Sequence, residues 1–143
     1  MKILYLLRHA TAAQATPPAM SDFDRTLSGF GVRQARLVGR YMQENRMQPD
    51  FVHSSAATRT TQTARLVMSA IFGNTAEQVA SNFAQELYTA PDEKLLAAIQ
   101  GTGSDYRSLM LVAHNPGVAE LAYALGKVNH YDPGTLSVFT ADC

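Results

Sequence analysis

The sequence predicts a single α/β domain, residues 1–143, in which a mainly parallel central sheet lies between two layers of helices. Three observations support this class. The length of 143 residues is close to the usual size of one domain. The composition, 46% hydrophobic and 17% charged, is typical of a folded globular protein. Short apolar runs alternate along the chain with stretches of helical periodicity, as they do in layered α/β proteins.

The chain begins with a strand, a loop and a helix. Residues 2–7 form an apolar run without clean alternation, which is typical of a strand covered on both faces. Residues 11–21, rich in Ala, Thr and Pro, form a loop directly after it. Ser28 is positioned to cap a helix that runs to about Met47. The apolar side chains that we expect on the inward face of this helix are Phe30, Leu37, Val38 and Tyr41.

The rest of the chain continues the same alternation of strands and helices. The predicted elements are a strand at 51–52, helices over 59–72 and from about 91 to 101, a strand over 108–113, a helix from 116 to 126 and a strand over 136–139. Gly73 and Gly126 stand where helical periodicity stops, and glycine commonly ends a helix. Because helices connect the strands, we expect the strands to run mainly parallel.

The charge balance excludes some classes of partner. Twelve Lys and Arg residues against twelve Asp and Glu residues give a net charge of zero, so we expect neither a nucleic acid nor a membrane as partner. The apolar run at residues 3–7 is too short for a signal-peptide core or for a membrane span of about 20 residues, and we expect a cytoplasmic monomer. The one cysteine, Cys143, allows neither an intramolecular disulfide nor a cysteine-based metal site.

Basic side chains follow three of the predicted strands. Arg8 and His9 come directly after the first, Arg59 begins the helix after the second, and His114 follows residues 108–113. Ligands of parallel sheets bind beyond the carboxyl ends of the strands, so we expect these four side chains to converge. Guanidinium groups match phosphoryl oxygens, and the pocket is predicted to bind a dianion. Carboxylates that could hold a divalent metal are missing from these segments.

His9 is the candidate nucleophile. A neutral imidazole can attack phosphorus when one ring nitrogen has a free lone pair and the other is held as a donor. Arg8 and Arg59 are expected to lower the pKa of His9 and to keep its ring unprotonated near neutral pH. His114 either stays cationic or donates a hydrogen bond to the phosphoryl oxygens in the transition state.

Four motifs occur in order along the chain. They are Leu7-Arg8-His9-Ala10, Asp24-Arg25-Thr26-Leu27-Ser28 followed by Gly31 and Gln34-Ala35, the segment from Ser55 to Ala64, and the segment from Leu111 to Gly117. Together they resemble the histidine phosphatase superfamily, and within it the short phosphohistidine phosphatase branch typified by SixA. The resemblance spans nearly the whole chain. Ala10, Ala56 and Ala113 stand where the family often has glycine or proline, and these changes remove no functional group.

The resemblance implies a role for each of the four basic residues. His9 is the nucleophile that is phosphorylated during turnover, and Arg8, Arg59 and His114 form the phosphate pocket without a cofactor. The implied substrate is phosphohistidine on a histidine-phosphotransfer or phosphotransferase-system protein. Two other functions stay open: a small-molecule phosphomonoesterase with the same His9 chemistry, and a phosphate-recognition module without turnover.

The general acid is the role for which the sequence offers several candidates. Many family members use a carboxylate from the variable segment before the last catalytic strand, where Glu86, Asp92 and Glu93 are available. We select Glu86 because Glu86-Leu87-Tyr88 resembles a recurring SixA-type segment. An imidazole leaving group, with a pKa of about 6.5, can also take its proton from solvent.

The remaining charged side chains near these motifs are expected to be structural. Asp22, Asp24 and Arg25 lie beside the first loop, where we expect ion pairs or capping contacts rather than catalysis. His53 and His130 match no position that the proposed chemistry requires.

Overall fold

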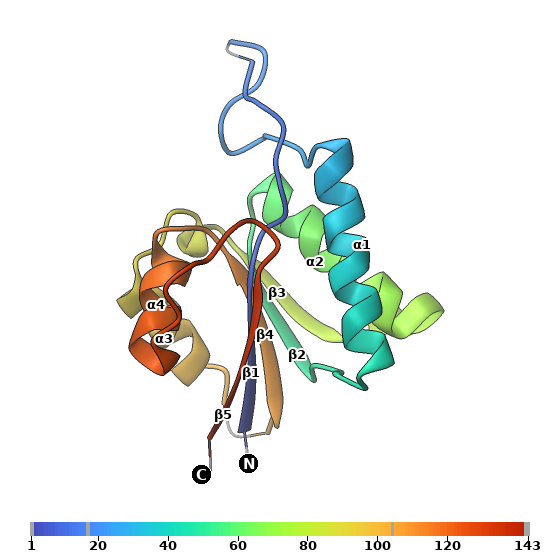
Figure 1. Ribbon diagram of the computed structural model, residues 1–143, viewed down its shortest axis with the longest axis vertical. Coiled ribbons are helices and arrows are strands. Elements are labelled where there is room, and N and C mark those ends of the chain that lie inside the picture. The colour runs from blue at the N-terminus through green and yellow to red at the C-terminus, as the bar shows by residue number, and fades with distance from the viewer. Residues whose placement is uncertain (1, 17, 104, 142–143) are drawn as a thin grey trace.

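A five-stranded sheet forms the centre of the molecule (Figure 1). The computed structural model describes residues 2–16, 18–103 and 105–141. The strands are β1 (Lys2–Arg8), β2 (Phe51–Ser55), β3 (Ala80–Ala84), β4 (Ser108–Ala113) and β5 (Leu136–Ala141). They pair in the order β3-β2-β4-β1-β5, and the edge strand β5 runs antiparallel to β1 while the other pairs are parallel. The predicted mainly parallel sheet is confirmed.

Helices cover both faces of the sheet. On one face lie α1 (Gly29–Glu44) and α2 (Thr58–Phe72), and on the other lie α3 (Asp92–Gln100) and α4 (Gly117–Gly126) (Figure 1). Two short 3-10 helices, η1 (Gly73–Gln78) and η2 (Gln85–Leu87), flank β3. Within the described residues, none of the helices combines the length and the apolar character that a membrane span needs.

The side chains of β1 alternate between two apolar cores. Tyr5 and Leu7 pack with Met42 of α1 and Val67 of α2 on one face of the sheet. Leu6 packs on the other face with side chains of α3 and α4. Because helices cover both faces, β1 and β4 can consist almost entirely of apolar residues, which explains why neither run alternates between apolar and polar side chains.

The prediction of which face of α1 is buried is wrong. Of the four side chains expected there, Val38 packs against a core. The other three are more than half exposed: Phe30, Leu37 and Tyr41. The buried positions of the helix are Gly31, Ala35, Gly39 and Met42. Most of these residues are small, and a Cβ atom on Gly39 would lie 2.5 Å from Ala70 Cβ in α2. The helix therefore buries the face that permits the closest approach to α2.

Two smaller differences concern the ends and the edge of the fold. Ser28 caps α1 as predicted, because its Oγ accepts a hydrogen bond from the Gly31 N–H at 3.0 Å. The helix ends at Glu44, however, rather than near Met47. The strand β3 has no apolar run that would predict it, because its sequence is Ala-Ser-Asn-Phe-Ala. It lies at the edge of the sheet, where polar side chains are tolerated.

The loop after β1 is attached to the start of α1. Thr11 donates its backbone N–H to Gln34 Oε1 at 2.8 Å, and its carbonyl oxygen accepts from the Ser28 N–H at 3.0 Å. A Cβ atom on Gly31 would lie 1.9 Å from that same carbonyl oxygen, so only glycine permits this approach. The second motif therefore holds in place the chain that follows His9.

Replacing Gly31 with alanine is expected to lower the free energy of unfolding by about 2 kcal/mol or more, because the added methyl group overlaps the Thr11 carbonyl. Gly29→Ala is the matched control, since its Cβ atom would meet only the end of the Arg33 side chain at 3.9 Å. Urea unfolding of both variants measures the difference. Equal stability of the two variants would contradict the close approach.

Candidate active site

Arg8, His9, Arg59 and His114 come together at the carboxyl edge of the sheet. Arg8 ends β1 and His9 follows it, Arg59 lies in the first turn of α2 after β2, and His114 follows β4. His9, Arg59 and His114 are 7%, 6% and 4% exposed, and the centroids of the two imidazole rings lie 5.2 Å apart. Because β2, β4 and β1 are parallel neighbours, three strand ends supply one buried cationic site.

The backbone fixes the tautomer of His9. Its Nδ1 lies 2.7 Å from the Ala10 carbonyl oxygen, and because a carbonyl only accepts hydrogen bonds, Nδ1 carries the proton of the neutral ring. The lone pair of Nε2 is then available for attack. The pKa of His9 is lowered to about 4. Burial is the largest cause, the Ala10 hydrogen bond opposes it, and the positive charges of Arg59 and Arg8 also lower the pKa. The ring is therefore neutral at neutral pH.

His114 is also held as a neutral ring. Burial is the largest cause that lowers its pKa to about 3, followed by the positive charge of Arg59. Its Nε2 lies 2.8 Å from Ser55 Oγ, which accepts a hydrogen bond from the Ala57 N–H. A serine hydroxyl can donate to Nε2 or accept from it, and in the tautomer in which it donates, Nδ1 carries the proton of the imidazole. Of the two predicted roles of His114, hydrogen-bond donor is the one that fits a neutral ring.

Three buried nitrogen atoms of the site have no hydrogen-bond partner among the described residues. They are Arg8 Nε, Arg59 Nε and His114 Nδ1. Buried donors are nearly always paired, because an unpaired one costs about 1–3 kcal/mol. Two of these donors belong to guanidinium cations, so the set is suited to the oxygens of a phosphoryl group. Within the described part of the chain, no three His, Cys, Asp or Glu side chains are grouped to hold a metal ion.

One backbone carbonyl holds both Arg8 and Asn115. Tyr131 O accepts hydrogen bonds from Arg8 Nη1 and Asn115 Nδ2, each at 2.9 Å. The Tyr131 hydroxyl in turn donates to Leu6 O at 2.6 Å inside the core. Asn115 Oδ1 accepts from the Ala119 N–H at 3.2 Å in the first turn of α4. The fourth motif, through Asn115, therefore connects the guanidinium group of Arg8 to α4 and to the sheet.

Two polar side chains of α2 hold the backbone around the site. Thr63 Oγ1 accepts a hydrogen bond from the Ala10 N–H at 3.1 Å and donates to Arg59 O at 2.7 Å. Gln62 Oε1 accepts from the Leu27 N–H at 2.7 Å. The third motif thus holds Ala10, the residue next to His9, in addition to supplying Arg59.

Glu86, the general acid that the resemblance indicates, lies on η2. Its side chain is exposed, and among the described residues no hydrogen bond or ion pair joins it to the four basic side chains. Asp92 and Glu93 stand in the first turn of α3. The nearby residue that reaches the site is Tyr88, whose ring makes a T-shaped contact with the His114 ring at 5.5 Å between centroids.

Among the described residues, Asp22 is a carboxylate that pairs with one of the site arginines, Arg59. It pairs with Arg25 at 3.0 Å, as the sequence suggests, but it also accepts hydrogen bonds from Arg59 Nη2 at 3.2 Å and from the Tyr88 hydroxyl. These contacts lower the pKa of Asp22 to about 2, with the Tyr88 hydrogen bond as the largest cause. A pairing between residues 37 positions apart leaves no local pattern in a sequence. The one feature of the sequence that points to a place for Asp22 near the site is its position in the loop after the first strand.

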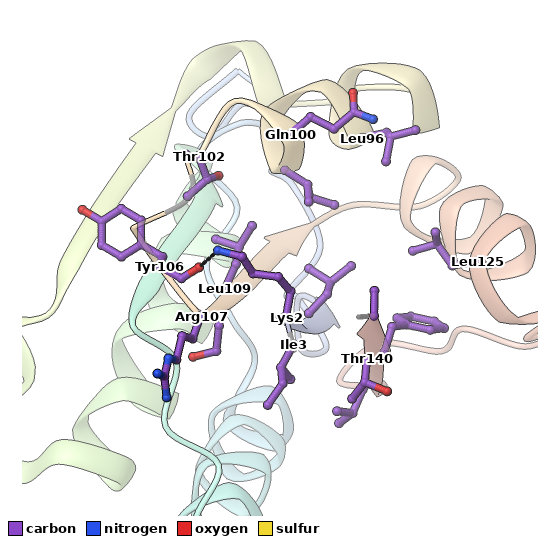
Figure 2. Close-up of a pocket in the computed structure, with 17 residues that line it drawn as sticks. Lys2, Ile3, Leu96, Gln100, Thr102, Tyr106, Arg107, Leu109, Leu125 and Thr140 are labelled. Carbon is purple, nitrogen blue, oxygen red and sulfur yellow. Dashed lines mark hydrogen bonds between the residues drawn. The ribbon is translucent and has the colours of Figure 1, made fainter. Parts of the chain in front are cut away.

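An apolar pocket lies at the opposite end of the strands (Figure 2). Its volume is about 800 Å³, and its walls include Ile3 and Leu109, near the starts of β1 and β4, and Leu96 and Leu125 from the helices. The four basic side chains of the candidate site lie at the other ends of the strands. The pocket is therefore separate from the cationic site.

Fold and site together define an α/β protein with two histidines and two arginines gathered at the carboxyl edge of a mainly parallel sheet. A sequence model of the Histidine phosphatase superfamily (branch 1) matches residues 4–80. The chain belongs to the histidine phosphatase superfamily, and the family that its motifs predict is confirmed.

Similar proteins match over most of this chain. An uncharacterized protein of Mycobacterium tuberculosis is 30% identical over 126 residues, which cover 88% of this chain and 73% of that protein. The crystal structure of a proposed phosphohistidine phosphatase SixA from Agrobacterium tumefaciens has a TM-score of 0.86 at 30% identity, covering 96% of this chain and 90% of that one. A proposed alpha-ribazole-5'-P phosphatase from Escherichia coli shares the fold, with a TM-score of 0.68 at 16% identity over 96% and 89% of the two chains.

The two site histidines are expected to make the folded protein less stable in acid. Unfolded imidazoles titrate at about pH 6.5, whereas His9 and His114 have pKa values of about 4 and about 3 in the fold. Between these values the unfolded chain binds more protons, so the free energy of unfolding is highest above about pH 6.5 and falls as the pH decreases toward 4. Urea unfolding at about pH 7.5 and about pH 5 measures this loss.

The matched control for this prediction is the double variant His9→Gln, His114→Asn, which has no imidazole in the site. Its free energy of unfolding is expected to decrease less between the two pH values than that of the wild type. An equal decrease in both proteins would contradict the lowered pKa values.

Proposed function

We propose that this protein is a metal-independent phosphatase in which His9 carries the phosphoryl group, and that its substrate is phosphohistidine on another protein. The observation that carries the proposal is the 2.7 Å contact between His9 Nδ1 and the Ala10 carbonyl, which leaves Nε2 free inside a cationic site. Membership of the histidine phosphatase superfamily supports phosphatase chemistry. The likeness to the proposed SixA of Agrobacterium tumefaciens, at 30% identity, supports phosphohistidine as the substrate.

In the first step, the lone pair of His9 Nε2 attacks the phosphorus atom of the substrate. The bond between phosphorus and the substrate imidazole breaks, and its electron pair passes to the leaving ring nitrogen. Arg8 and Arg59 offset the negative charge that spreads over the phosphoryl oxygens, and His114 Nδ1 donates a further hydrogen bond to them.

In the second step, the oxygen of a water molecule attacks the phosphorus of phospho-His9. The bond to Nε2 breaks, the electron pair returns to Nε2, and the water releases a proton to solvent as inorganic phosphate forms. Throughout the cycle the Nδ1 proton stays on its hydrogen bond to Ala10. The phosphorylated ring is therefore an imidazolium, which leaves phosphorus more readily than a neutral ring does.

The leaving group favours phosphohistidine over alkyl phosphates. An imidazole, with a pKa of about 6.5, departs near neutral pH without a strong acid, whereas an alkoxide needs a general acid to protonate it. The carboxyl group of Asp22, which contacts Arg59, has a pKa of about 2 and is ionised at neutral pH. Glu86 is exposed, and no hydrogen bond or ion pair joins it to the four basic side chains within the described part of the chain.

The partner that fits this chemistry is a histidine-phosphotransfer or phosphotransferase-system protein of the cytoplasm, because such proteins expose a phosphohistidine. A small-molecule phosphomonoesterase is the second candidate. Because the chain shares its fold with a proposed alpha-ribazole-5'-P phosphatase, small-molecule phosphates are included as alternative substrates in the assay.

Phosphate release from a phosphorylated histidine-phosphotransfer protein, measured without added metal, is expected to be fast for the wild type. His9→Ala removes the attacking nitrogen and is expected to reduce the rate by about 10⁴-fold or more. His130→Ala is the matched control, because His130 is exposed and lies outside the site, and it is expected to keep the wild-type rate.

Each alternative function predicts a different result in the same assay. Faster turnover of a sugar, nucleotide or terpenoid phosphate than of phosphohistidine would identify a phosphomonoesterase. Binding of phosphate without release from any substrate would identify a recognition module. Unchanged phosphate release by His9→Ala would contradict the covalent mechanism.

A further inference from the structure

Asp22 contacts Arg59 of the candidate site but has no role in the proposed catalytic cycle. Its carboxylate accepts hydrogen bonds from Arg59 Nη2 at 3.2 Å and from the Tyr88 hydroxyl, and it pairs with Arg25 at 3.0 Å. Its backbone oxygen accepts from Arg59 Nη1 at 2.7 Å. Three hydrogen bonds to the carboxylate and one to the backbone oxygen therefore hold Asp22 against the guanidinium group that we assign to the phosphoryl oxygens.

The contacts of Arg59 leave Asp22 on the outer side of the guanidinium group. Both terminal nitrogens face Asp22, whereas Nε is buried and has no partner among the described residues. The Arg59 side chain is 7% exposed and the Asp22 side chain is 52% exposed. The Asp22 carboxylate is therefore the more solvent-exposed partner beside this guanidinium group, and a substrate ring that approaches from solvent can reach it.

Tyr88 connects this carboxylate to the second imidazole. Its hydroxyl donates to Asp22 Oδ2, and its ring packs against the rings of His114 and Phe23 at 5.5 and 5.0 Å between centroids. The ring of Tyr88 also lies under the Arg59 guanidinium carbon at 5.8 Å. Asp22 is thus fixed relative to the site by side chains from three separate segments and is not a freely moving surface residue.

We propose that Asp22 is a specificity-determining residue that accepts a hydrogen bond from the leaving imidazole of phosphohistidine, at the ring nitrogen that is not bonded to phosphorus. This inference rests on the proposed function, because it names the group that recognises the substrate ring. The residues that present the carboxylate are Arg25, Arg59 and Tyr88.

Cleavage of the bond between phosphorus and the substrate ring needs no general acid from the protein. The substrate ring takes a proton from solvent at its free nitrogen, and the Asp22 carboxylate stabilises the resulting imidazolium. When His9 Nε2 forms its bond to phosphorus, the bond from phosphorus to the substrate ring breaks and its electron pair stays on that ring nitrogen. The ring leaves as neutral imidazole, and the proton facing Asp22 stays on it. No proton transfer is needed as the bond breaks.

The same carboxylate gives no help to a phosphate ester. An ester oxygen has no second nitrogen to donate a hydrogen bond, and an ionised carboxylate cannot supply the proton that an alkoxide needs. The negative charge also offsets part of the positive charge of Arg59, which weakens the attraction for any phosphoryl dianion. Asp22 therefore favours phosphohistidine relative to esters.

The test compares two substrates in two variants that each remove one negative charge from the same loop. The substrates are a phosphohistidine peptide and p-nitrophenyl phosphate, whose leaving group needs no protonation. Asp22→Asn keeps an acceptor oxygen for Arg59 and Tyr88 but loses the charge. Asp24→Asn is the matched control, since Asp24 is exposed and its carboxylate bonds to Ser21.

Asp22→Asn is expected to lower kcat/KM for the phosphohistidine peptide by about 10- to 100-fold and to change that for p-nitrophenyl phosphate by less than about twofold. Asp22→Glu, which retains the charge, is expected to keep more of the phosphohistidine activity. Asp24→Asn is expected to change neither value.

Three outcomes would overturn the inference. An equal fall for both substrates would show that Asp22 only positions Arg59, and no change for either would show that it has no role. Failure of the wild type to cleave the phosphohistidine peptide would overturn the proposed function itself, and the inference with it. Either of the first two outcomes, with cleavage by the wild type intact, would overturn the inference alone.

Discussion

The hydrogen bond from His9 Nδ1 to the Ala10 carbonyl is the interaction on which the proposed chemistry depends. A histidine that attacks phosphorus must be neutral, must keep one lone pair free and must hold its orientation. The 2.7 Å contact settles the tautomer and the orientation, and burial lowers the pKa of the ring to about 4. Burial is the largest single cause of this shift, and the positive charges of Arg59 and Arg8 act in the same direction.

The fold supplies this environment by bringing strand ends together. Parallel strands end at one edge of the sheet, so residues distant in the sequence become neighbours without a dedicated loop. The polar and glycine residues of the four motifs then hold the backbone there. Thr63 binds the Ala10 N–H, Asn115 shares a carbonyl with Arg8, and a Cβ atom on Gly117 would lie 2.1 Å from Ala90 O. These residues act on the site through the backbone.

The sequence predicts the parallel strands and the four basic residues because both leave local signals, an apolar run and a motif. It fails where the deciding contact is between distant segments. The buried face of α1 is set by how closely Gly31 and Gly39 allow neighbours to approach, which hydrophobic periodicity does not register. The contacts of Asp22 with Arg59 and Tyr88 leave no local signal either, because the three residues come from separate segments.

The most direct test of the central claim is to trap the phosphorylated protein. The wild type is mixed with a phosphohistidine peptide, quenched in base, which preserves phosphoryl groups on nitrogen, and digested for mass spectrometry. The mechanism predicts a phosphoryl group on His9 that forms and decays at rates consistent with turnover, and none in His9→Ala. Full turnover with no phosphorylated His9 at any time, or with the phosphoryl group on His114, would contradict it.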